Sequence, residues 1–517
     1  MKKQLHCDNW LIQDQEKSLM ARTLWILLVV ISASCSAAQH QPNILFIFTD
    51  DHATQAISAY GSQINNTPNI DRLAREGMIF NRCYVTNSIC APSRAVIQTG
   101  KYSHLNGVHT NQQDFDGTQQ TFPKLLQQHG YQTALVGKWH LKSTPTGFDY
   151  AEVLPGQGLY YNPIFLKDGV RVQHPGYVTD ITTDLALDWL KQKRNPTVPF
   201  MLMVQHKAPH RPWEPGPDKL TMYADETIPE PSNLLDDFDT RSSALHRQEL
   251  SIKDILDDRD LKIKFPNNLT PDQRALWEAA YARIIAEYKS GSLQDTELVQ
   301  WKYQQYIKDY LRCIASVDDN TGRLLDWLDE SGLSENTIVI YSSDQGFFLG
   351  EHGLIDKRFM YEESLRTPLI VRWPGHTKPG SVNGALVSNL DFAQTFLDIA
   401  GIAQPADMQG QSLIPLMQGN TPNNWRESHY YQFYEEGWGV PRHEGVTNGR
   451  YKLISYYDLN EWELFDLAND PQEMNNVCHQ QDYQTVMKEL QAEMVRLKLN
   501  YAVPPSLTLE AQREAFK

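Results

Sequence analysis

The sequence predicts an α/β protein with a large, mostly parallel central sheet flanked by helices on both faces, followed by a smaller C-terminal antiparallel sheet with one helix. Two observations support this fold class. Short apolar runs alternate with helical segments over most of the chain, as in parallel sheets that are buried on both faces. From about residue 425 the pattern changes to aromatic, β-prone runs with turn residues between them, which is typical of an antiparallel sheet.

Residues 1–38 form the first element, which we expect to be a leader. Met20 offers an alternative start, because Arg22, an apolar core from Leu24 to Ile31 and small residues up to Ala38 follow it, as in a signal peptide. We therefore expect export to the periplasm or secretion. The apolar core is too short to span a bilayer and no other apolar run is long enough, so no integral membrane span is expected. Cys35 leaves a lipid anchor open as an alternative.

Residues 39–424 form the second element, a predicted catalytic domain. Apolar runs bounded by turn residues predict four buried strands, at Asn43 to Phe48, Tyr131 to Val136, Pro199 to Val204 and Thr337 to Tyr341. Apolar residues recurring at helical spacing predict a long helix from about Tyr303 to Leu328.

The remaining elements are an insertion and a C-terminal subdomain. The segment from about 217 to 295 is charged, and we expect it to be a helical insertion that covers one side of the sheet. Residues 425–517 predict an α+β subdomain whose strands lie in "HYYQFY", "HEGVTNGRYKLISYY" and "EWELFDL", with a helix near Gln484 to Leu499.

Composition narrows the function. The net charge of −16 argues against nucleic acid as a partner, so an anionic substrate would need a local basic pocket. Two of the six cysteines, Cys7 and Cys35, fall in the expected leader. The other four are scattered without a CxxC pair, which excludes a disulfide-rich scaffold and a cysteine zinc site and leaves one disulfide open.

Each of the four predicted strands runs into ionisable or metal-binding residues. The segments that follow are "TDDH", "GKWHLK", "QHKAPHRP" and "SSDQG". Ligands of open parallel sheets bind beyond the carboxyl ends of the strands, so we expect these four segments to converge on one site.

The residue types in these segments predict a metal ion and an oxyanion. Oxygen ligands suit Ca²⁺, with Mg²⁺ as the alternative, and are offered by Asp50, Asp51, Asp344 and Gln345. Cations and acid–base groups suit an anionic group whose leaving oxygen must be protonated, and are supplied by Arg94, Lys138, His140, His210 and Lys357. Cys90 precedes Pro92, a favoured first residue of a helix, so its side chain should lie at a helix N-terminus that attracts anions.

The stretch "CAPSR" followed by "TG" resembles the type I sulfatase signature C-x-P-S-R, from the alkaline-phosphatase-like superfamily. The resemblance extends over nearly the whole mature chain. Segments similar to those of the family follow in the expected order: "TDD", "GKWH", "APHRP", "SDQG…GEHG…DK" and "WELFDLANDPQEMNN". Within the family, the chain looks most like bacterial carbohydrate sulfatases, including the N-acetylglucosamine-6-sulfatase and iduronate-sulfatase types.

The resemblance implies a modified nucleophile. A formylglycine-generating (sulfatase-maturating) enzyme would convert Cys90 to formylglycine (3-oxoalanine) before final folding. One hydroxyl of the hydrated aldehyde would attack sulfur, and the other would lose its proton to expel sulfate. Asp50, Asp51, Asp344 and Gln345, with residue 90, would hold calcium.

The resemblance also implies a role for each of the other site residues. Arg94 would support the formylglycine hydroxyl, and Lys138 and Lys357 would neutralise charge on the sulfate oxygens. His210 would protonate the leaving oxygen and His140 would deprotonate the remaining hydroxyl. Many relatives have asparagine or histidine where Gln345 stands, so we expect a slightly altered metal shell in which the amide oxygen can still coordinate.

The expected substrate is a sulfated oligo- or polysaccharide, either a glycosaminoglycan or an algal polysaccharide. Four further residues are predicted to contact it: His206, His352, Arg442 and His443. Two other hypotheses stay open. One is a phosphonate or phosphate diester hydrolase on the same scaffold, and the other is a sulfated-glycan binding protein in which Cys90 is not converted.

Overall fold

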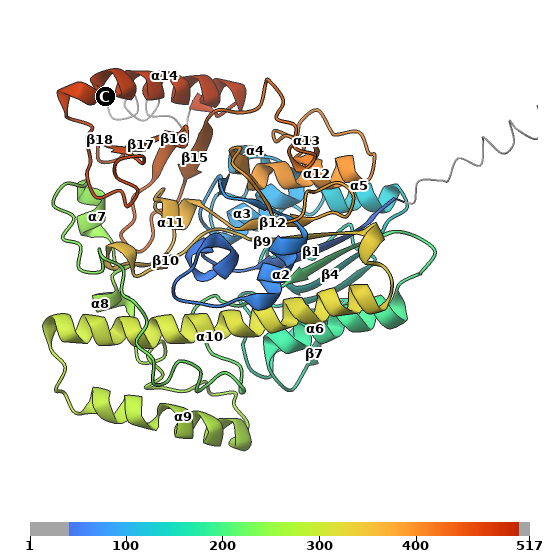
Figure 1. The fold of residues 1–517 in the computed structure, drawn as a ribbon, viewed down its shortest axis with the longest axis horizontal. Helices are drawn as coiled ribbons and strands as arrows, with labels where there is room; N and C mark the ends of the chain where they lie inside the picture. The colour runs from blue at the N-terminus through green and yellow to red at the C-terminus, as the bar shows by residue number, and fades with distance from the viewer. Residues whose placement is uncertain (1–40, 506–517) are drawn as a thin grey trace, which may run out of the picture. The chain divides into compact units, whose positions relative to one another are not determined.

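The computed structural model describes residues 41–505, so the predicted leader at 1–38 lies outside the described residues. The main domain is built on a ten-stranded sheet (Figure 1). Its strand order is β13 (Ser381–Asn383), β2 (Met78–Phe80), β12 (Leu369–Arg372), β9 (Thr337–Ser343), β1 (Asn43–Thr49), β8 (Phe200–Gln205), β4 (Gln132–Lys138), β5 (Tyr150–Leu154), β6 (Ile164–Lys167) and β7 (Val170–Gln173).

The four strands predicted from the sequence form the centre of this sheet. They are β9, β1, β8 and β4, each within two residues of its expected bounds, and each pairs in parallel with its neighbour. Strand β5 extends the parallel part, whereas β12, β6 and β7 pair antiparallel near the two edges. The prediction of a large, mostly parallel sheet is therefore confirmed.

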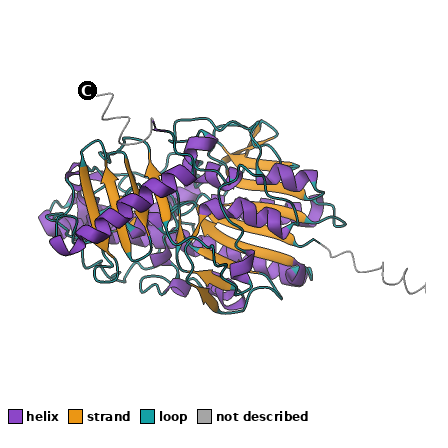
Figure 2. Ribbon diagram, turned by 90° about the horizontal axis from the view of Figure 1, so that it is seen from above, coloured by secondary structure: helices purple, strands orange, loops and turns teal. Residues whose placement is uncertain are grey.

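Side chains that alternate along the central strands build two cores. On β1, Leu45 and Ile47 join one apolar cluster, whereas Ile44 and Phe46 join the other. The first face is covered by α2 (Pro68–Glu76), α6 (Val178–Asp188) and α10 (Asp295–Glu330). The second is covered by α3 (Cys90–Thr99), α5 (Phe122–Gln128) and α12 (Phe392–Ile399). The sheet is thus buried on both sides, as Figure 2 shows.

The predicted long helix is present as α10, which begins eight residues earlier than its apolar repeat indicates. The insertion before it is less helical than its charged composition suggests. It contains α7 (Ser243–Arg247), α8 (Ile252–Ile255) and α9 (Pro271–Lys289), but residues 217–242 hold no helix or strand. Pro229 and Pro231 lie in that stretch, and a proline within a helix removes a backbone hydrogen bond and clashes with the preceding turn.

The C-terminal subdomain is a four-stranded antiparallel sheet with one helix, as predicted. The strands are β15 (His429–Phe433), β16 (His443–Thr447), β17 (Tyr451–Tyr456) and β18 (Glu461–Asp466). Helix α14 (Gln484–Asn500) lies across them (Figure 2). Leu490, Met494 and Leu497 of this helix pack on Val446 and Leu453 of the sheet.

Short elements complete the described chain. They are β3 (Cys83–Tyr84) with β14 (Val387–Ser388), β10 (Phe348–Leu349) with β11 (Ile355–Asp356), α4 (Ser103–Asn106), α11 (Glu362–Leu365) and α13 (Ile414–Met417). Cys83, Cys90, Cys313 and Cys478 are all free and buried, so no disulfide forms among residues 41–505. Over the same range, no helix is both long enough and apolar enough to cross a membrane.

Candidate active site

The order of the central strands brings the predicted segments together. Strands β9, β1, β8 and β4 are neighbours and parallel, so their carboxyl ends lie along one edge of the sheet. Asp50 follows β1, Asp344 follows β9, and Lys138 is the last residue of β4. The four segments therefore converge, as ligand sites of open α/β sheets do.

Cys90 begins helix α3, and Ile89 before it is extended. The Cys90 side chain is 1% exposed. Burial raises the pKa of its thiol above the ordinary value, although Lys357 and Lys138 oppose the shift. The unmodified side chain is therefore a protonated thiol, which is a poor nucleophile.

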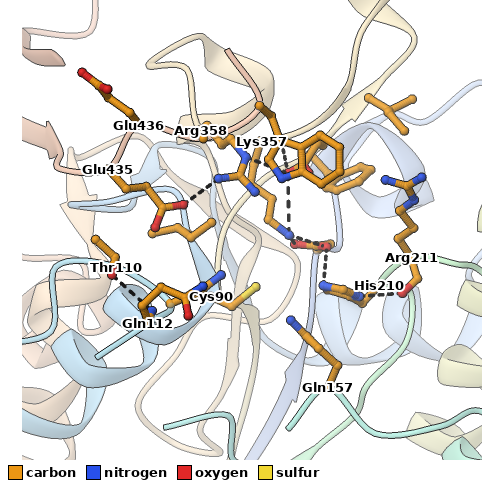
Figure 3. A pocket seen from close by; sticks show the side chains of 18 residues that line it. Cys90, Thr110, Gln112, Gln157, His210, Arg211, Lys357, Arg358, Glu435 and Glu436 are labelled. Atoms are coloured by element: carbon orange, nitrogen blue, oxygen red, sulfur yellow. Dashed lines mark hydrogen bonds and ion pairs between the residues drawn. The ribbon is translucent and has the colours of Figure 1, made fainter. Parts of the chain in front are cut away.

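Cys90 lies in a pocket of about 470 Å³ (Figure 3). The pocket draws on loops from distant parts of the chain. It is lined by Asp51, Ile89, Cys90, Thr110, Asn111, Gln112, Gln157, His210, Arg211, Phe347, Ile355, Asp356, Lys357, Arg358, Glu435, Glu436, Gly437 and Trp438. A pocket of this size is in the range of small-molecule sites.

Three buried carboxylates lie beside this pocket. Asp50, Asp51 and Asp344 each offer an oxygen, and these oxygens lie within 4.8 Å of one another. Burial raises the pKa of Asp51 to about 6 and raises that of Asp344 well above its usual range, and the neighbouring Asp50 adds to both shifts. Burial would also raise the pKa of Asp50, but the charges of Lys138 and Arg94 hold it well below its ordinary value.

Cations from three separate parts of the chain bind these carboxylates. The Lys357 Nζ donates to both oxygens of Asp51, at 2.6 and 2.7 Å, and the Lys138 Nζ donates to Asp50. The Arg94 guanidinium donates to Asp344 Oδ2, with Nη2 at 3.0 Å, and its Nη2 lies 3.4 Å from Asp50 Oδ1. Three acidic groups and three cations are thus held together out of contact with solvent.

The donor set fits a hard divalent cation. Within the described part of the chain, the buried oxygens Asp50 Oδ1 and Gln345 Oε1 have no hydrogen-bond partner. A buried polar atom is rarely left without a partner, and a cation held between these two oxygens would supply one. Carboxylate and amide oxygens are the ligands that Ca²⁺ and Mg²⁺ prefer. Asp50, Asp51, Asp344 and Gln345 could therefore hold such an ion.

The two predicted acid–base histidines lie in different surroundings. The His210 Nε2 faces the pocket, 3.8 Å from Asp51 Oδ2, and its Nδ1 lies 2.7 Å from the Arg211 carbonyl oxygen (Figure 3). Burial and the charge of Lys138 hold the pKa of His210 well below its usual range, so the ring is neutral in the free protein. His140 follows β4 with a φ of 55° and lines a separate hollow with Trp139, outside the lining of the Cys90 pocket. Burial and Lys138 lower the pKa of His140 to about 2.

The structure does not place the four predicted substrate contacts in the lining of the pocket, so their contact with substrate stays a prediction. None of His206, His352, Arg442 and His443 is among the described residues that line it. His206 and His443 are fully buried, and the His352 Nδ1 lies 2.8 Å from Asp236. The Arg442 guanidinium is paired with Asp458 at 2.9 Å.

Residues that were not predicted from the sequence line the pocket instead. Gln157, Arg211, Arg358, Glu435 and Trp438 line the pocket but were not singled out from the sequence. Arg211 and Arg358 stand next to His210 and Lys357, so their adjacency to predicted site residues was an available signal. Gln157, Glu435 and Trp438 lie in connecting loops with no motif that marks them.

Fold and site together define a hydrolase that acts on an anionic ester. Comparison with known proteins gives the family. The Sulfatase family model matches residues 42–402, and the model for the C-terminal part of N-sulphoglucosamine sulphohydrolase matches residues 350–500. The chain belongs to the sulfatase family, and it is an enzyme that hydrolyses sulfate esters.

Similar proteins include both bacterial and animal sulfatases. The chain is 47% identical over 497 residues to an N-acetylglucosamine-6-O-sulfatase of Bacteroides thetaiotaomicron, which covers 90% of this chain and 89% of the relative. It is 28% identical to an N-acetylglucosamine-6-sulfatase of Homo sapiens, over 80% of this chain and 72% of the relative.

Solved structures agree with this assignment. One solved structure shows a protein in complex with its substrate, D-glucosamine-2-N,6-O-disulfate. It matches this chain with a TM-score of 0.88 at 46% identity, over 90% of this chain and 99% of that one. A phosphonate monoester hydrolase of Agrobacterium radiobacter has a TM-score of 0.67 at 20% identity, over 89% of this chain and 96% of that one. That likeness is one of fold alone.

Proposed function

We propose that this sulfatase removes the 6-O-sulfate from N-acetylglucosamine units of a sulfated glycan. The observation that carries the proposal is the pocket itself, in which Cys90 at the start of α3 faces a group of three carboxylates and three cations. The sugar follows from the 47% identical relative, whose substrate unit is N-acetylglucosamine 6-sulfate by name. Of the two expected substrate classes, this supports a glycosaminoglycan-type glycan over an algal polysaccharide.

Residue 90 is proposed to act as formylglycine, which supplies a hydrated aldehyde as the nucleophile in place of the thiol. The surroundings of Cys90 support this. Cys90 lies at the start of α3 in a pocket that Lys357 also lines, and a buried, protonated thiol has no other evident role there. We propose a sulfatase-maturating enzyme as the partner that makes the conversion.

Asp50, Asp51, Asp344 and Gln345 are proposed to hold Ca²⁺, with Mg²⁺ as the alternative. Bound there, the ion would polarise the sulfate and favour an ionised nucleophile. Lys357 lines the pocket and keeps its charge, because Asp51 holds its pKa well above the ordinary value despite burial. Lys357 and Lys138 are proposed to neutralise the sulfate oxygens, and Arg94 to fix Asp344 and Asp50 in position.

His210 is proposed to hold the proton that the leaving sugar oxygen needs. Its Nε2 faces the pocket, whereas its Nδ1 is held by the Arg211 carbonyl oxygen. The ring is neutral in the free protein, and a bound sulfate would favour its protonated form through its negative charge. His140, which lines a hollow separate from the Cys90 pocket, is proposed as the base that acts on the remaining hydroxyl.

We also propose that the enzyme is exported to the periplasm or secreted, on the pattern of residues 20–38. A lipid anchor at Cys35 stays an alternative. Both the leader and Cys35 lie outside the described residues.

The proposal is tested with protein made alongside a maturating enzyme. We expect the peptide containing Cys90 to lose about 18 Da on conversion of thiol to aldehyde. We expect the same sample to release sulfate from N-acetylglucosamine 6-sulfate, and the Cys90→Ala variant to release none. Full conversion with turnover of phosphodiesters but no sulfate release would overturn the substrate class. If Cys90 stays a thiol in a host that carries an active maturating enzyme, the proposal that formylglycine is the nucleophile would be overturned.

A further inference from the structure

An exposed tryptophan stands at the rim of the active-site pocket. Trp438 is 45% exposed, yet it lines the same pocket as the buried Cys90. Its φ is 58°, in the left-handed region that bulky side chains rarely adopt. Strain of this kind persists only where the surrounding structure enforces it, and it gathers at ligand-binding sites.

The loop that carries Trp438 is fixed from both sides. The Val440 amide donates to the Gly437 carbonyl oxygen at 3.1 Å, and the Glu249 amide donates to the Trp438 carbonyl oxygen at 2.8 Å. Gly439 has a φ of 69°, and a Cβ there would lie 2.1 Å from the Arg247 carbonyl oxygen. The insertion before α8 thus holds the backbone of the tryptophan in place.

Arg211 supports the indole ring. Its guanidinium carbon lies 5.9 Å from the Trp438 ring centroid, within the range of a cation–π contact. The guanidinium is itself fixed by Asp260, which accepts from its Nε at 2.9 Å and its Nη2 at 2.5 Å, and by the Ile255 carbonyl oxygen at 3.0 Å. The ring therefore rests on a side chain with little freedom to move.

Hydrogen-bonding groups line the same pocket on its other side. Figure 3 draws Glu435 and Glu436 on the opposite side of the pocket from Arg211, with Gln112 below them. The Glu435 carboxylate is positioned by Arg358 at 2.7 Å. An aromatic face together with carboxylate and amide groups suits a sugar ring, because one face of the ring presents C–H groups and its edges present hydroxyls.

We propose that Trp438, backed by Arg211, is a stacking platform for the glycan unit next to the sulfated one. This inference rests on the proposed function. The sulfated unit must place its sulfate against residue 90, which is 1% exposed, so it fills the inner part of the pocket. Trp438 lies at the solvent side and is left for the next unit along the chain.

The test compares three substrates. They are 4-methylumbelliferyl sulfate, N-acetylglucosamine 6-sulfate and a disaccharide that ends in the same sulfated unit. Trp438→Ala should lower kcat/KM for the disaccharide about ten-fold and leave the values for the other two within about two-fold. Trp438→Phe should retain most of the disaccharide activity. Leu276→Ala is the matched control, because Leu276 is 51% exposed on α9 and lies outside the pocket lining.

The outcomes separate the platform from the proposed function. The platform alone would be overturned if the wild type releases sulfate from both sugars and Trp438→Ala leaves the ratio of their kcat/KM values unchanged. An equal loss on all three substrates would assign Trp438 a structural role and would also overturn it. Turnover of the aryl sulfate alone by the wild type would overturn the proposed substrate and the platform with it.

Discussion

At the scale of single residues, the site depends on charges that balance one another out of contact with solvent. Lys357, Lys138 and Arg94 offset the carboxylates that surround them, and two buried oxygens of the site accept no hydrogen bond from residues 41–505. Removing one partner from such a group leaves an uncompensated buried charge, which is more costly than the pair is stabilising.

Asp344→Asn tests the metal site. We expect it to weaken the response to Ca²⁺ added back after chelation and to lower kcat/KM by at least about 100-fold, because a ligand and the partner of Arg94 are lost together. Activity is followed during the calcium titration. The matched control is Asp318→Asn, which removes a buried carboxylate that accepts from the Asn69 and Ile70 amides, away from the pocket. A normal calcium response in Asp344→Asn would contradict the assignment.

His210→Gln tests the proton donor. An aryl leaving group departs without a proton, whereas a sugar oxygen needs one. We therefore expect kcat to fall about 100-fold or more on N-acetylglucosamine 6-sulfate and far less on 4-methylumbelliferyl sulfate. His140→Gln should lower both rates alike, because its proposed step follows departure of the leaving group. The reverse pattern in the two variants would exchange their roles.

Sequence reasoning located residues at or shortly after the ends of the central strands, but it did not single out several loop residues that line the pocket. Asp50, Lys138, His210 and Asp344 could be predicted because strand ends of a parallel sheet share one edge. His206 and His443 do not line the pocket, because both rings are buried in the protein interior, and their contact with substrate stays a prediction. Their neighbourhood in sequence says nothing about which way a side chain points.

At the scale of elements, the sequence likewise predicts the central strands better than the loops. The apolar runs located β1, β4, β8 and β9 to within two residues, since burial on both faces leaves a continuous hydrophobic signal. The insertion has no such signal. Its long stretch without helix or strand is held by contacts with other parts of the chain, such as the Arg241 guanidinium on the Met474 carbonyl oxygen.

Gly137→Ala should disrupt the end of β4. Gly137 has a φ of 105°, and a Cβ there would lie 1.9 Å from the Gln205 carbonyl oxygen of β8. We expect a loss of about 3 kcal/mol or more in unfolding free energy and a displaced Lys138, hence lower activity. Gly130→Ala is the control, with a φ of 89° and open space around it, and should cost about 1 kcal/mol without loss of activity. Equal destabilisation of the two variants in chemical unfolding would contradict the steric argument.

At the scale of the whole molecule, buried histidines link stability to pH. Burial lowers the pKa of His206 and His429 to about 3 and that of His443 to about 4. The folded state disfavours their protonated forms, whereas the unfolded chain takes up these protons near pH 6.5. Their contribution to stability is therefore complete above about pH 6.5 and is lost as pH falls toward 3.

His429→Gln isolates one of these groups. The wild type should lose about 1.4 kcal/mol more per pH unit than the variant between about pH 6 and 4. Urea unfolding at several pH values measures the two slopes. Comparing slopes cancels groups of opposite sign, such as Glu463, whose pKa burial raises to about 7. Parallel slopes would contradict the assignment.

The burial of Cys90 also limits when its side chain can be modified. A side chain with 1% exposure is out of reach of another enzyme once the protein has folded, so the proposed conversion to formylglycine would have to precede closure of the pocket. Faster folding would then yield less active protein, and slower folding would yield more, even where the final structures are identical. For this sulfatase, the fraction of active molecules would depend on how long the chain remains unfolded.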